Sequence, residues 1–361
     1  MSCKYCFYHD VGRNRQVKSH GVMTHETLHA MLDNIESALV SGDEVTFAFQ
    51  GGEPLLAGLA FFQVFVEKVQ GFKSKVKVSY AIQTNGTLVN NQWTEFFKAH
   101  GFLVGLSIDA NVGLHDLYRT YQDGGTTFKQ VMEAKHQFDA LEIPYNVLTV
   151  LTNEMAMRPK EVFDFLQKEN IRFMQFIPCL APLEFDECVG GGAEYALTTT
   201  HFARFYNELF GYWHHALMKG NYISIKLFDD VIYLLGTGRA VSCGMLGSCT
   251  NQWVIEADGS VYPCDFYAVD KYCMGNITTD DLEQMDASKA LHQFLEEAHE
   301  ALPVICQNHC EFWKMCYGGC RRMRGHSYVD PITNSCGYQQ FLRQNIQELG
   351  RIAQLEHGTK E

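Results

Sequence analysis

From residue 24 to residue 180 the sequence alternates between helical patterns and short apolar runs, and this alternation most constrains the fold. The apolar runs predict five strands, at 45–50, 77–83, 102–109, 145–151 and 172–178. Regular alternation of strands and helices predicts a parallel sheet with right-handed crossovers. Helices on only one side of a curved sheet would make a full or partial barrel, in which a site forms at the carboxyl ends of the strands.

Polar and glycine-rich motifs follow the predicted strands at the points where the strands end. One such motif is typical of an ordinary turn, but several in register indicate a site. The motifs are Gln50-Gly51-Gly52-Glu53-Pro54, Gln83-Thr84-Asn85-Gly86, Ser107-Ile108-Asp109 and Pro178-Cys179-Leu180. We therefore expect a binding or catalytic site at this edge of the sheet.

The composition limits the class of partner. The chain has 361 residues, 46% of them hydrophobic, which is enough for a large core and suggests two domains, or one large domain with an appendage. Its formal net charge of −13 is opposite to that of a protein that tracks the nucleic-acid backbone, so no nucleic-acid partner is expected. No stretch approaches the roughly 20 apolar residues needed to span a bilayer. The first residues show no apolar signal segment, so we expect a cytoplasmic protein.

Thirteen cysteines are many for a cytoplasmic protein, and they are unevenly placed. Two lie at the start, nine lie between Cys243 and Cys336, and only Cys179 and Cys188 separate these groups. A reducing compartment favours metal ligation over disulfides. The wide spacing favours iron–sulfur clusters over tetrahedral zinc, although both stay open. Enough thiols for two four-thiolate sites lie at Cys243, Cys249, Cys264, Cys306, Cys310, Cys316, Cys320 and Cys336.

The segment QWVIEADGSVYPC, at 252–264, predicts a β-hairpin with an Asp258-Gly259 turn. Its second strand would present Cys264 and Asp265 just past its end. Two further helices are expected at 199–219 and 227–236, and a last helix at 338–355 closes the chain.

Seven motifs, taken together, carry a resemblance that covers nearly the whole chain. They are CKYCFYH, FAFQGGEPLLAG, QTNGTL, FLVGLSID, CGMLGSCT, DGSVYPCDFY and CYGGCRR. In this order they resemble the radical S-adenosylmethionine (SAM) superfamily and, more closely, its anaerobic sulfatase-maturating enzymes with a C-terminal twin-cluster (SPASM) region. The resemblance implies an α/β fold with a partial (β/α)6 TIM-like barrel over residues 1–235. A SPASM domain with two auxiliary [4Fe–4S] clusters would follow over residues 236–361.

The activity implied by the resemblance is the oxygen-independent oxidation of one Ser or Cys side chain in a sulfatase to Cα-formylglycine. The implied cofactors are SAM and, in the full-length family, three [4Fe–4S] clusters. The implied partners are an unfolded or nascent sulfatase polypeptide and a low-potential electron donor, and we expect a monomer. Another SPASM radical SAM peptide maturase is one alternative. The other alternative is a non-catalytic iron–sulfur protein. Its only support is that the first of three cysteines expected in the radical-cluster motif, described next, is missing.

The radical cluster of this family is bound by C-x3-C-x2-C, of which Cys3 and Cys6 match the last two cysteines. The first cysteine would lie four residues before Cys3, and the family's first barrel strand would precede it. A misplaced start or a truncation would explain both absences, and a natural two-cysteine variant is the alternative. The radical cluster is therefore in question, and the 361 residues as written are predicted to lack radical activity.

Further site residues follow from the resemblance one by one. Gly51, Gly52 and Glu53 match the strand-end motif that receives the SAM amino group, where glycine allows close approach and a carboxylate suits an ammonium. Other matches to SAM contacts are Tyr5, Ser107, Arg119 and Leu180. Taken singly, Tyr5 would be interpreted as an aromatic that shields the cluster, Arg119 as a surface charge and Leu180 as part of the core.

Asp265 matches the catalytic base of the family, which takes the hydroxyl or thiol proton after a hydrogen atom has left the substrate Cβ. A hairpin-edge carboxylate that binds a backbone amide is the alternative. Gln50 is a candidate contact to the substrate peptide.

The auxiliary ligands interleave in the family. Cluster I would take Cys243, Cys249, Cys264 and Cys320, and cluster II would take Cys306, Cys310, Cys316 and Cys336. Four thiolates leave no open iron, which favours electron transfer or structure over substrate binding. The C-x3-C spacing that begins at Cys306 departs from the C-x2-C common in the family. The cysteines left over, expected to be ordinary thiols, are Cys179, Cys188 and Cys273.

Overall fold

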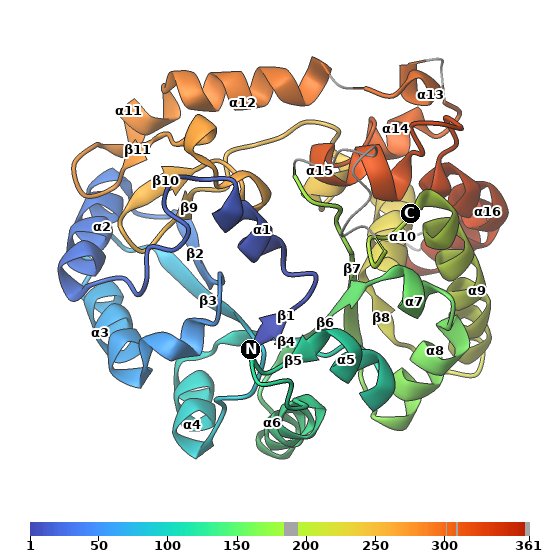
Figure 1. Cartoon of the computed structure of the whole chain (residues 1–361), viewed down its shortest axis with the longest axis horizontal. Coiled ribbons are helices and arrows are strands. Elements are labelled where there is room, and N and C mark those ends of the chain that lie inside the picture. Colours follow the sequence, from blue (N-terminus) through green and yellow to red (C-terminus); the bar gives the residue numbers. More distant parts are fainter. Residues whose placement is uncertain (184–193, 301, 308–309, 358–361) are drawn as a thin grey trace.

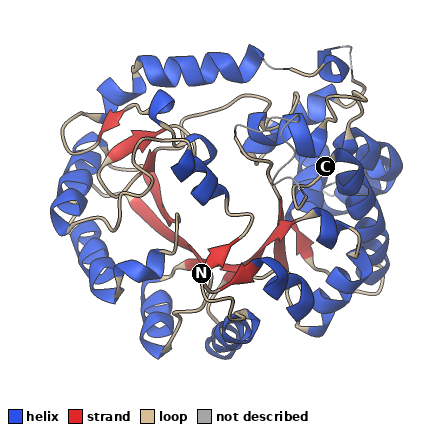
Figure 2. Ribbon diagram, in the orientation of Figure 1, coloured by secondary structure: helices blue, strands red, loops and turns tan. Residues whose placement is uncertain are grey.

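The computed structural model describes residues 1–183, 194–300, 302–307 and 310–357. A six-stranded parallel sheet forms its centre, in the order β2-β3-β4-β6-β7-β8. The sheet curves, and helices follow it along its outer side (Figure 1, Figure 2). The predicted α/β fold is therefore confirmed. The strands are β2 (Glu44–Phe49), β3 (Lys77–Thr84), β4 (Leu103–Ser107), β6 (Tyr145–Leu151), β7 (Phe173–Pro178) and β8 (Ser224–Ile225).

All five strands expected from the sequence are present, and β8 is an additional one. It is two residues long and pairs with β7 through Phe173↔Ser224 and Met174↔Ile225. It lies at the opposite edge of the sheet from β2, so it is not the strand that the family pattern places before β2. The absence of that first strand stays a prediction.

Several helices of the barrel begin at side-chain caps. The Thr24 hydroxyl accepts a hydrogen bond from the Thr27 amide (3.1 Å), and Asn90 and Asn111 cap their helices in the same way. These caps satisfy amides that the first helical turn leaves without partners. The helices are α2 (His25–Ala38), α3 (Leu59–Gln70), α4 (Asn91–His100), α5 (Val112–Tyr118), α6 (Phe128–Leu141), α7 (Asn153–Ala156), α8 (Pro159–Lys168), α9 (Thr199–Leu217) and α10 (Lys226–Thr237).

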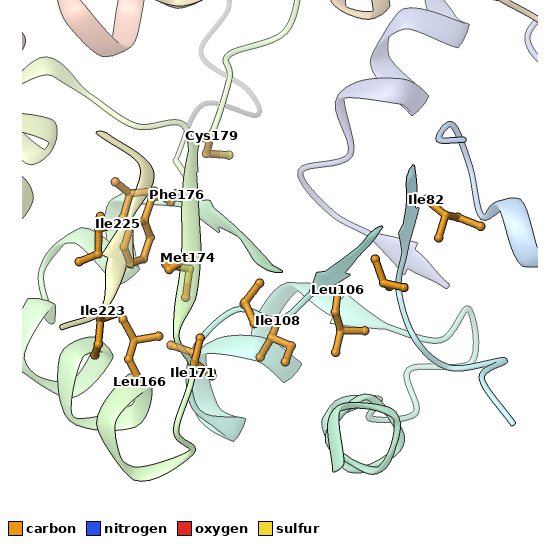
Figure 3. Close-up of a cluster of buried hydrophobic side chains, with 14 of the residues drawn as sticks. Ile82, Leu106, Ile108, Leu166, Ile171, Met174, Phe176, Cys179, Ile223 and Ile225 are labelled. Carbon is orange, nitrogen blue, oxygen red and sulfur yellow. The ribbon is translucent and has the colours of Figure 1, made fainter. Parts of the chain in front are cut away.

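Aromatic side chains fill the layer between the sheet and its helices. Phe49 of β2 lies 4.9 Å from Phe62 and 4.8 Å from Phe65, measured between ring centroids. Figure 3 shows a mostly aliphatic part of the same core, with Leu106, Met174 and Phe176 among the labelled side chains of the sheet. Burial of this much apolar surface holds the strand ends, and therefore the motifs that follow them, in fixed positions.

Between α10 and the final helix the strands are short, and so are the helices apart from one of 12 residues. The predicted hairpin is present as β9 (Val254–Ile255) and β10 (Ser260–Tyr262), and β11 (Gly275–Asn276) adds a third antiparallel strand. This region lies across the open side of the strand arc (Figure 1, orange to red). Its helices are α11 (Leu282–Asp286), α12 (Lys289–Glu300), α13 (Val304–Gln307), α14 (Trp313–Cys316) and α15 (Arg321–Met323).

The final helix, α16 (Gly337–His357), returns to the barrel and packs on α9 and α10 (Figure 1). There Asn345 Nδ2 donates a hydrogen bond to Asn207 Oδ1 (2.7 Å). The domain boundary at residue 235 stays a prediction. Among the described residues, no helix combines the length and the apolar character that crossing a bilayer requires.

Candidate active site

The motif after β2 is tied to the end of β3 by the side chain of Glu53. Glu53 Oε1 accepts hydrogen bonds from Thr84 Oγ1 (2.8 Å) and from the Leu55 amide (3.1 Å), and Oε2 accepts one from the Asn85 amide (2.8 Å). Burial raises the pKa of Glu53, although these hydrogen bonds oppose the shift. The carboxylate therefore joins two strand-end motifs that the sequence placed at the same edge of the sheet. Its contact with SAM stays a prediction.

Gly51 and Gly52 give this edge an open backbone. Gly51 has φ +119°, a conformation that residues with a side chain rarely adopt, and a Cβ there would lie 3.6 Å from the Tyr8 ring. A Cβ on Gly52 would meet nothing within 4 Å. The space next to Gly52 is consistent with the close approach of a ligand that the sequence analysis expected.

Asp109 connects the N-terminal cysteine loop to the end of β4. Its carboxylate accepts hydrogen bonds from Arg119 Nε (2.9 Å) and Nη2 (3.3 Å) and from the Val150 amide (3.0 Å), and Tyr5 Oη donates to it as well. The Arg119 guanidinium lies 5.4 Å from the centre of the Tyr5 ring. Asp109, Arg119 and Tyr5 are all buried. Arg119 is therefore not a surface arginine, and its Nε and Nη2 groups both donate hydrogen bonds to Asp109.

Asp109 belongs to the predicted strand-end motif Ser107-Ile108-Asp109, but no role was predicted for it. The available signal was a carboxylate directly after a buried strand, since a buried carboxylate needs partners. Ser107 lies half-buried at the end of β4, and Leu180 lies half-buried two residues after the end of β7. Both are therefore at the carboxyl edge where they were predicted, and their contacts with SAM stay predictions.

Cys3 and Cys6 lie on either side of Tyr5. Cys3 belongs to β1 (Ser2–Cys3), which pairs with β5 (Arg119–Thr120) and places Cys3 opposite Arg119. The Cys6 amide donates to the Cys3 carbonyl (3.2 Å), and Cys6 precedes α1 (Phe7–Arg13). Burial raises the pKa of Cys3, and the charge of Arg119 opposes this shift. Cys3 and Cys6 thus lie close together, and their role as cluster ligands stays a prediction.

Asp265 lies against Gln50, although 215 residues separate them in sequence. Gln50 Nε2 donates a hydrogen bond to Asp265 Oδ2 (3.2 Å), and Asp265 Oδ1 accepts one from the Phe266 amide (2.9 Å). The Cys264 thiol lies 3.6 Å from Asp265 Oδ1. The predicted base, the predicted substrate contact and a predicted cluster ligand therefore meet at the end of β2.

The four thiols assigned to cluster I are neighbours. Burial raises the pKa of Cys249 to about 11, and the charges of Cys320 and Cys243 add to the shift. Burial is also the main cause that raises the pKa of Cys264, and the charges of Asp265, Cys320 and Cys249 add to this shift. A buried thiolate next to other thiolates is unfavourable without a cation, and an iron cluster supplies positive charge. The donor set fits such a cluster.

The four thiols assigned to cluster II line one small hollow, which Phe312, Trp313 and Gln339 complete. Gln339 Nε2 lies 3.4 Å from Cys310 Sγ, and the Gln339 amide lies 3.4 Å from Cys336 Sγ. Burial raises the pKa of Cys306 to about 11 and that of Cys316 to about 12. The unusual C-x3-C spacing at Cys306 therefore does not keep this cysteine away from the others.

In the described part of the chain, no three His, Cys, Asp or Glu side chains converge as the ligands of a single metal ion would.

Of the left-over cysteines, Cys179 is buried at the end of β7 and the Cys273 thiol lies 3.7 Å from the Gly275 carbonyl oxygen. Cys188 lies outside the described residues. The ordinary role expected for these thiols stays a prediction.

Two family models match the chain. The radical SAM superfamily matches residues 1–171, and an iron–sulfur cluster-binding domain, SPASM, matches residues 243–311.

Several curated proteins are similar over most of their length. A cysteine-type anaerobic sulfatase-maturating enzyme of Clostridium perfringens is 38% identical over 90% of this chain and 86% of its own. One of Clostridium novyi is 34% identical over 98% and 94%, respectively. A serine-type enzyme of Bacteroides thetaiotaomicron is 27% identical over 95% and 86%. A solved structure described as native anSMEcpe with bound AdoMet and Cp18Cys peptide has a TM-score of 0.89 at 34% identity, and covers 99% of this chain and 96% of that chain.

Proposed function

Because the chain belongs to the anaerobic sulfatase-maturating enzymes of the radical SAM superfamily, we propose that it oxidises a cysteine of a sulfatase polypeptide to Cα-formylglycine. Asp265 is the proposed base. The observation that carries this assignment is the contact of Asp265 with Gln50 at the carboxyl end of β2 (3.2 Å). That edge also carries Gly51, Gly52 and Glu53, which are the proposed contacts to SAM.

The proposed ligands of the cofactors follow the placement of the thiols. Cys3 and Cys6 contribute to the radical cluster, and the two neighbouring sets of four cysteines hold the auxiliary clusters. When bound, SAM and the clusters supply the radical that removes a hydrogen atom from the substrate Cβ and the acceptor for the electron that follows. The other proposed contacts to SAM are Tyr5, Ser107, Arg119 and Leu180.

In this proposal the substrate side chain binds next to the Asp265 carboxylate, beside the side-chain amide of Gln50. The Asp265 carboxylate accepts the thiol proton, which leaves a carbon radical that gives up its electron readily. The product of proton and electron loss is a thioaldehyde, and water exchanges its sulfur for oxygen with release of hydrogen sulfide. Gln50 orients the side chain by donating a hydrogen bond from Nε2.

The choice of cysteine over serine is supported by the relatives. Those named cysteine-type are 34–38% identical to this chain, and those named serine-type are 27–28% identical. A thiol also has a lower pKa than a hydroxyl, so a carboxylate base removes its proton more easily. We further propose that the protein acts as a monomer in the cytoplasm, before the sulfatase folds, and receives electrons from a low-potential donor.

The test uses the anaerobically reconstituted protein, SAM, a reductant and matched peptides that carry Cys or Ser at the target position. Two chains are compared: the 361 residues as written, and the same residues preceded by a segment with a cysteine four residues before Cys3. With the extended chain, mass spectrometry should show thiol sulfur replaced by an aldehyde oxygen in the Cys peptide. Comparable oxidation of the Ser peptide would refute the cysteine preference. No oxidised product from either peptide would refute the function.

The role of Asp265 is tested with Asp265→Asn in the extended chain. Loss of the base should lower formylglycine formation by about 10²–10⁴-fold, while SAM is still cleaved to 5′-deoxyadenosine. Asp164→Asn, on the outer face of α8 where Asp164 pairs with Lys160 (2.7 Å), is the matched control and should change neither rate. Full product from Asp265→Asn would show that another group is the base.

A further inference from the structure

Glu256, in the β9–β10 hairpin, reaches across to the segment that follows Cys6. Its carboxylate accepts hydrogen bonds from Tyr8 Oη, at 2.8 and 2.6 Å, and from Arg15 Nη1, at 2.8 Å. These donors lie 248 and 241 residues away in sequence. Neither the motifs nor the family matches gave any of these three residues a role. The contact therefore joins two distant parts of the chain through side chains that have no other assigned function.

The Glu256–Arg15 pair is almost completely withdrawn from solvent, with side-chain exposures of 6% and 1%. Buried charges of this kind are retained only where they have partners. The Arg15 guanidinium also lies 5.7 Å from the centre of the Tyr8 ring and donates to the Ala268 carbonyl (3.4 Å). Within the described residues, Arg15 Nε and Nη2 are buried without a partner. Glu256 is thus the charge on which the burial of Arg15 depends.

Further contacts hold the same two segments together. Phe7, next to Cys6, packs edge-on against Phe266, next to Asp265, with ring centroids 5.0 Å apart. His20 Nδ1 lies 3.0 Å from Asp258 Oδ2 at the hairpin turn, and the Gln16 amide donates to Asp270 (2.8 Å). The cysteine loop and the Asp265 turn are therefore held against each other by neighbours on both sides.

The position of Tyr8 gives the contact its consequence. The phenol ring lies against Gly51, since a Cβ on that glycine would be 3.6 Å from Tyr8 Cζ and Oη. Gly51 follows Gln50, which donates to Asp265. The hairpin that carries Glu256 leads directly into Cys264 and Asp265. One rigid hairpin thus sets the place of Asp265 and, through Glu256, the place of the loop that carries Cys3 and Cys6.

We propose that Glu256 is a positioning residue that sets the distance between the N-terminal cysteine loop and the Asp265 turn by holding Tyr8 and Arg15. The inference rests on the proposed function for its catalytic consequence, but the contact itself does not. With the contact intact, the radical source and the base face the same substrate side chain. With the contact broken, SAM is still cleaved but its radical is aimed less well at the substrate Cβ. The hydrogen atom of 5′-deoxyadenosine then comes from buffer or reductant C–H bonds instead of the peptide.

The test compares wild type with Glu256→Gln, Tyr8→Phe and Glu283→Gln, all in the extended and reconstituted chain. Glu283→Gln is the matched control, because Glu283 is exposed on α11. Hydrogen exchange of the amides of α1 and of residues 15–20 reads the contact directly. We expect exchange about tenfold faster in Glu256→Gln and about threefold faster in Tyr8→Phe, with no change in Glu283→Gln. Unchanged exchange in Glu256→Gln would overturn the inference.

The ratio of 5′-deoxyadenosine to oxidised peptide reads the consequence, and we expect it to rise about tenfold in Glu256→Gln. An unchanged ratio with faster exchange would show a structural contact only, and would overturn the positioning role. If Glu256→Gln loses protection in β3 and β4 as well, it is unfolded. Tyr8→Phe, which keeps the ring against Gly51, then decides the matter. If wild type oxidises no peptide, the proposed function fails, while the exchange experiment still decides whether Glu256 holds α1.

Discussion

The barrel and the cysteine-rich region from residue 243 to residue 336 are held together in different ways. The barrel has strands of five to eight residues at its centre and large side chains withdrawn from solvent, among them Phe138, Phe205 and Trp213. The cysteine-rich region has strands of two or three residues and, apart from α12, helices of at most five residues. Its eight proposed ligand cysteines lie in two groups and are mostly partly buried. The cysteine-rich region also buries apolar side chains, such as Val261 and Phe294. We expect it to depend in addition on what its thiols bind, whereas the barrel depends mainly on apolar burial.

The largest expected effect comes from removing iron. Binding of a structural metal by thiolates can contribute on the order of 10 kcal/mol to the folding of a small domain. Chelation of iron without oxygen should therefore unfold the cysteine-rich region and leave the barrel folded. Hydrogen exchange should show amides of β10 and α14 at nearly unfolded rates, with protection kept in β3, β4 and β6. If β10 and α14 kept full protection without iron, the two regions would not differ as described.

The opposite test is a truncation in the barrel core. Phe138 is fully buried and lies 6.3 Å from Phe97 and 5.8 Å from Tyr145, measured between ring centroids. Phe138→Ala should lower the unfolding free energy of the barrel by about 3–5 kcal/mol, because the lost contacts leave a cavity. Iron content per chain should stay the same. Phe173→Ala is the control, since Phe173 is 58% exposed, and its effect should be below about 0.5 kcal/mol. Loss of iron in Phe138→Ala would mean that the regions are not independent.

The same contrast decided how far the sequence could predict the fold. Every long strand was predicted within two residues; for example, 145–151 matches β6 and 77–83 matches β3. These strands are buried and long enough to show a pattern. In contrast, β1, β5, β8 and β11 are two residues long, so they carry no periodicity and were not predicted. Only the hairpin of the cysteine-rich region was found, because its Asp258-Gly259 turn is a strong local signal.

For the candidate site, the residue types and their order could be predicted from the sequence, but their contact partners could not. Gln50 and Asp265 were each named, yet their contact depends on how the hairpin lies on the sheet. Tyr8, Arg15 and Glu256 were given no role, since no spacing or composition distinguishes them from surface residues. Long-range contacts of single side chains follow from tertiary packing, which no local pattern records.

A smaller effect on stability is expected from the pH dependence of one histidine of the barrel. Burial lowers the pKa of His115 in the barrel to about 4, from an ordinary value of 6.5. The unfolded chain thus binds a proton at this site between pH 6.5 and pH 4 that the folded chain does not bind. Stability therefore falls as the pH falls through this window, by up to about 3 kcal/mol at this site.

His115→Asn should remove that part of the pH dependence. His115 Nδ1 accepts from the Asp109 amide (3.2 Å), and Nε2 lies 3.1 Å from Thr127 Oγ1. An amide can keep one of these hydrogen bonds, so the variant should lose stability at pH 7 but lose less on acidification. Urea unfolding of the barrel at pH 7 and pH 5 measures both. His29→Asn is the control, because His29 lies on the exposed side of α2, and it should leave the pH dependence as in wild type.

The smallest expected effect belongs to Glu297 in the cysteine-rich region. Burial opposes its ionisation, but hydrogen bonds from Lys271, Tyr272, Gln293 and Arg321 outweigh this and lower the pKa to about 2. The folded chain thus holds the carboxylate charged more firmly than the unfolded chain does. The resulting stabilisation is present above pH 4.5 and is lost as the pH falls toward 2. Because solvent reaches this network, it should amount to less than about 1 kcal/mol.

Glu297→Gln, compared with the exposed neighbour Glu296→Gln, measures that contribution. Arg321 lies 3.0 Å from Glu297 and directly follows Cys320, so the network connects α12 to a proposed cluster ligand. If thiolate ligation holds this region, Glu297→Gln should speed hydrogen exchange in α12 by less than about fivefold while iron is bound. The same substitution should matter more after partial loss of iron, since the network is then one of the few remaining contacts. A large effect in the iron-loaded protein would mean that polar contacts, and not the thiols, hold the region together.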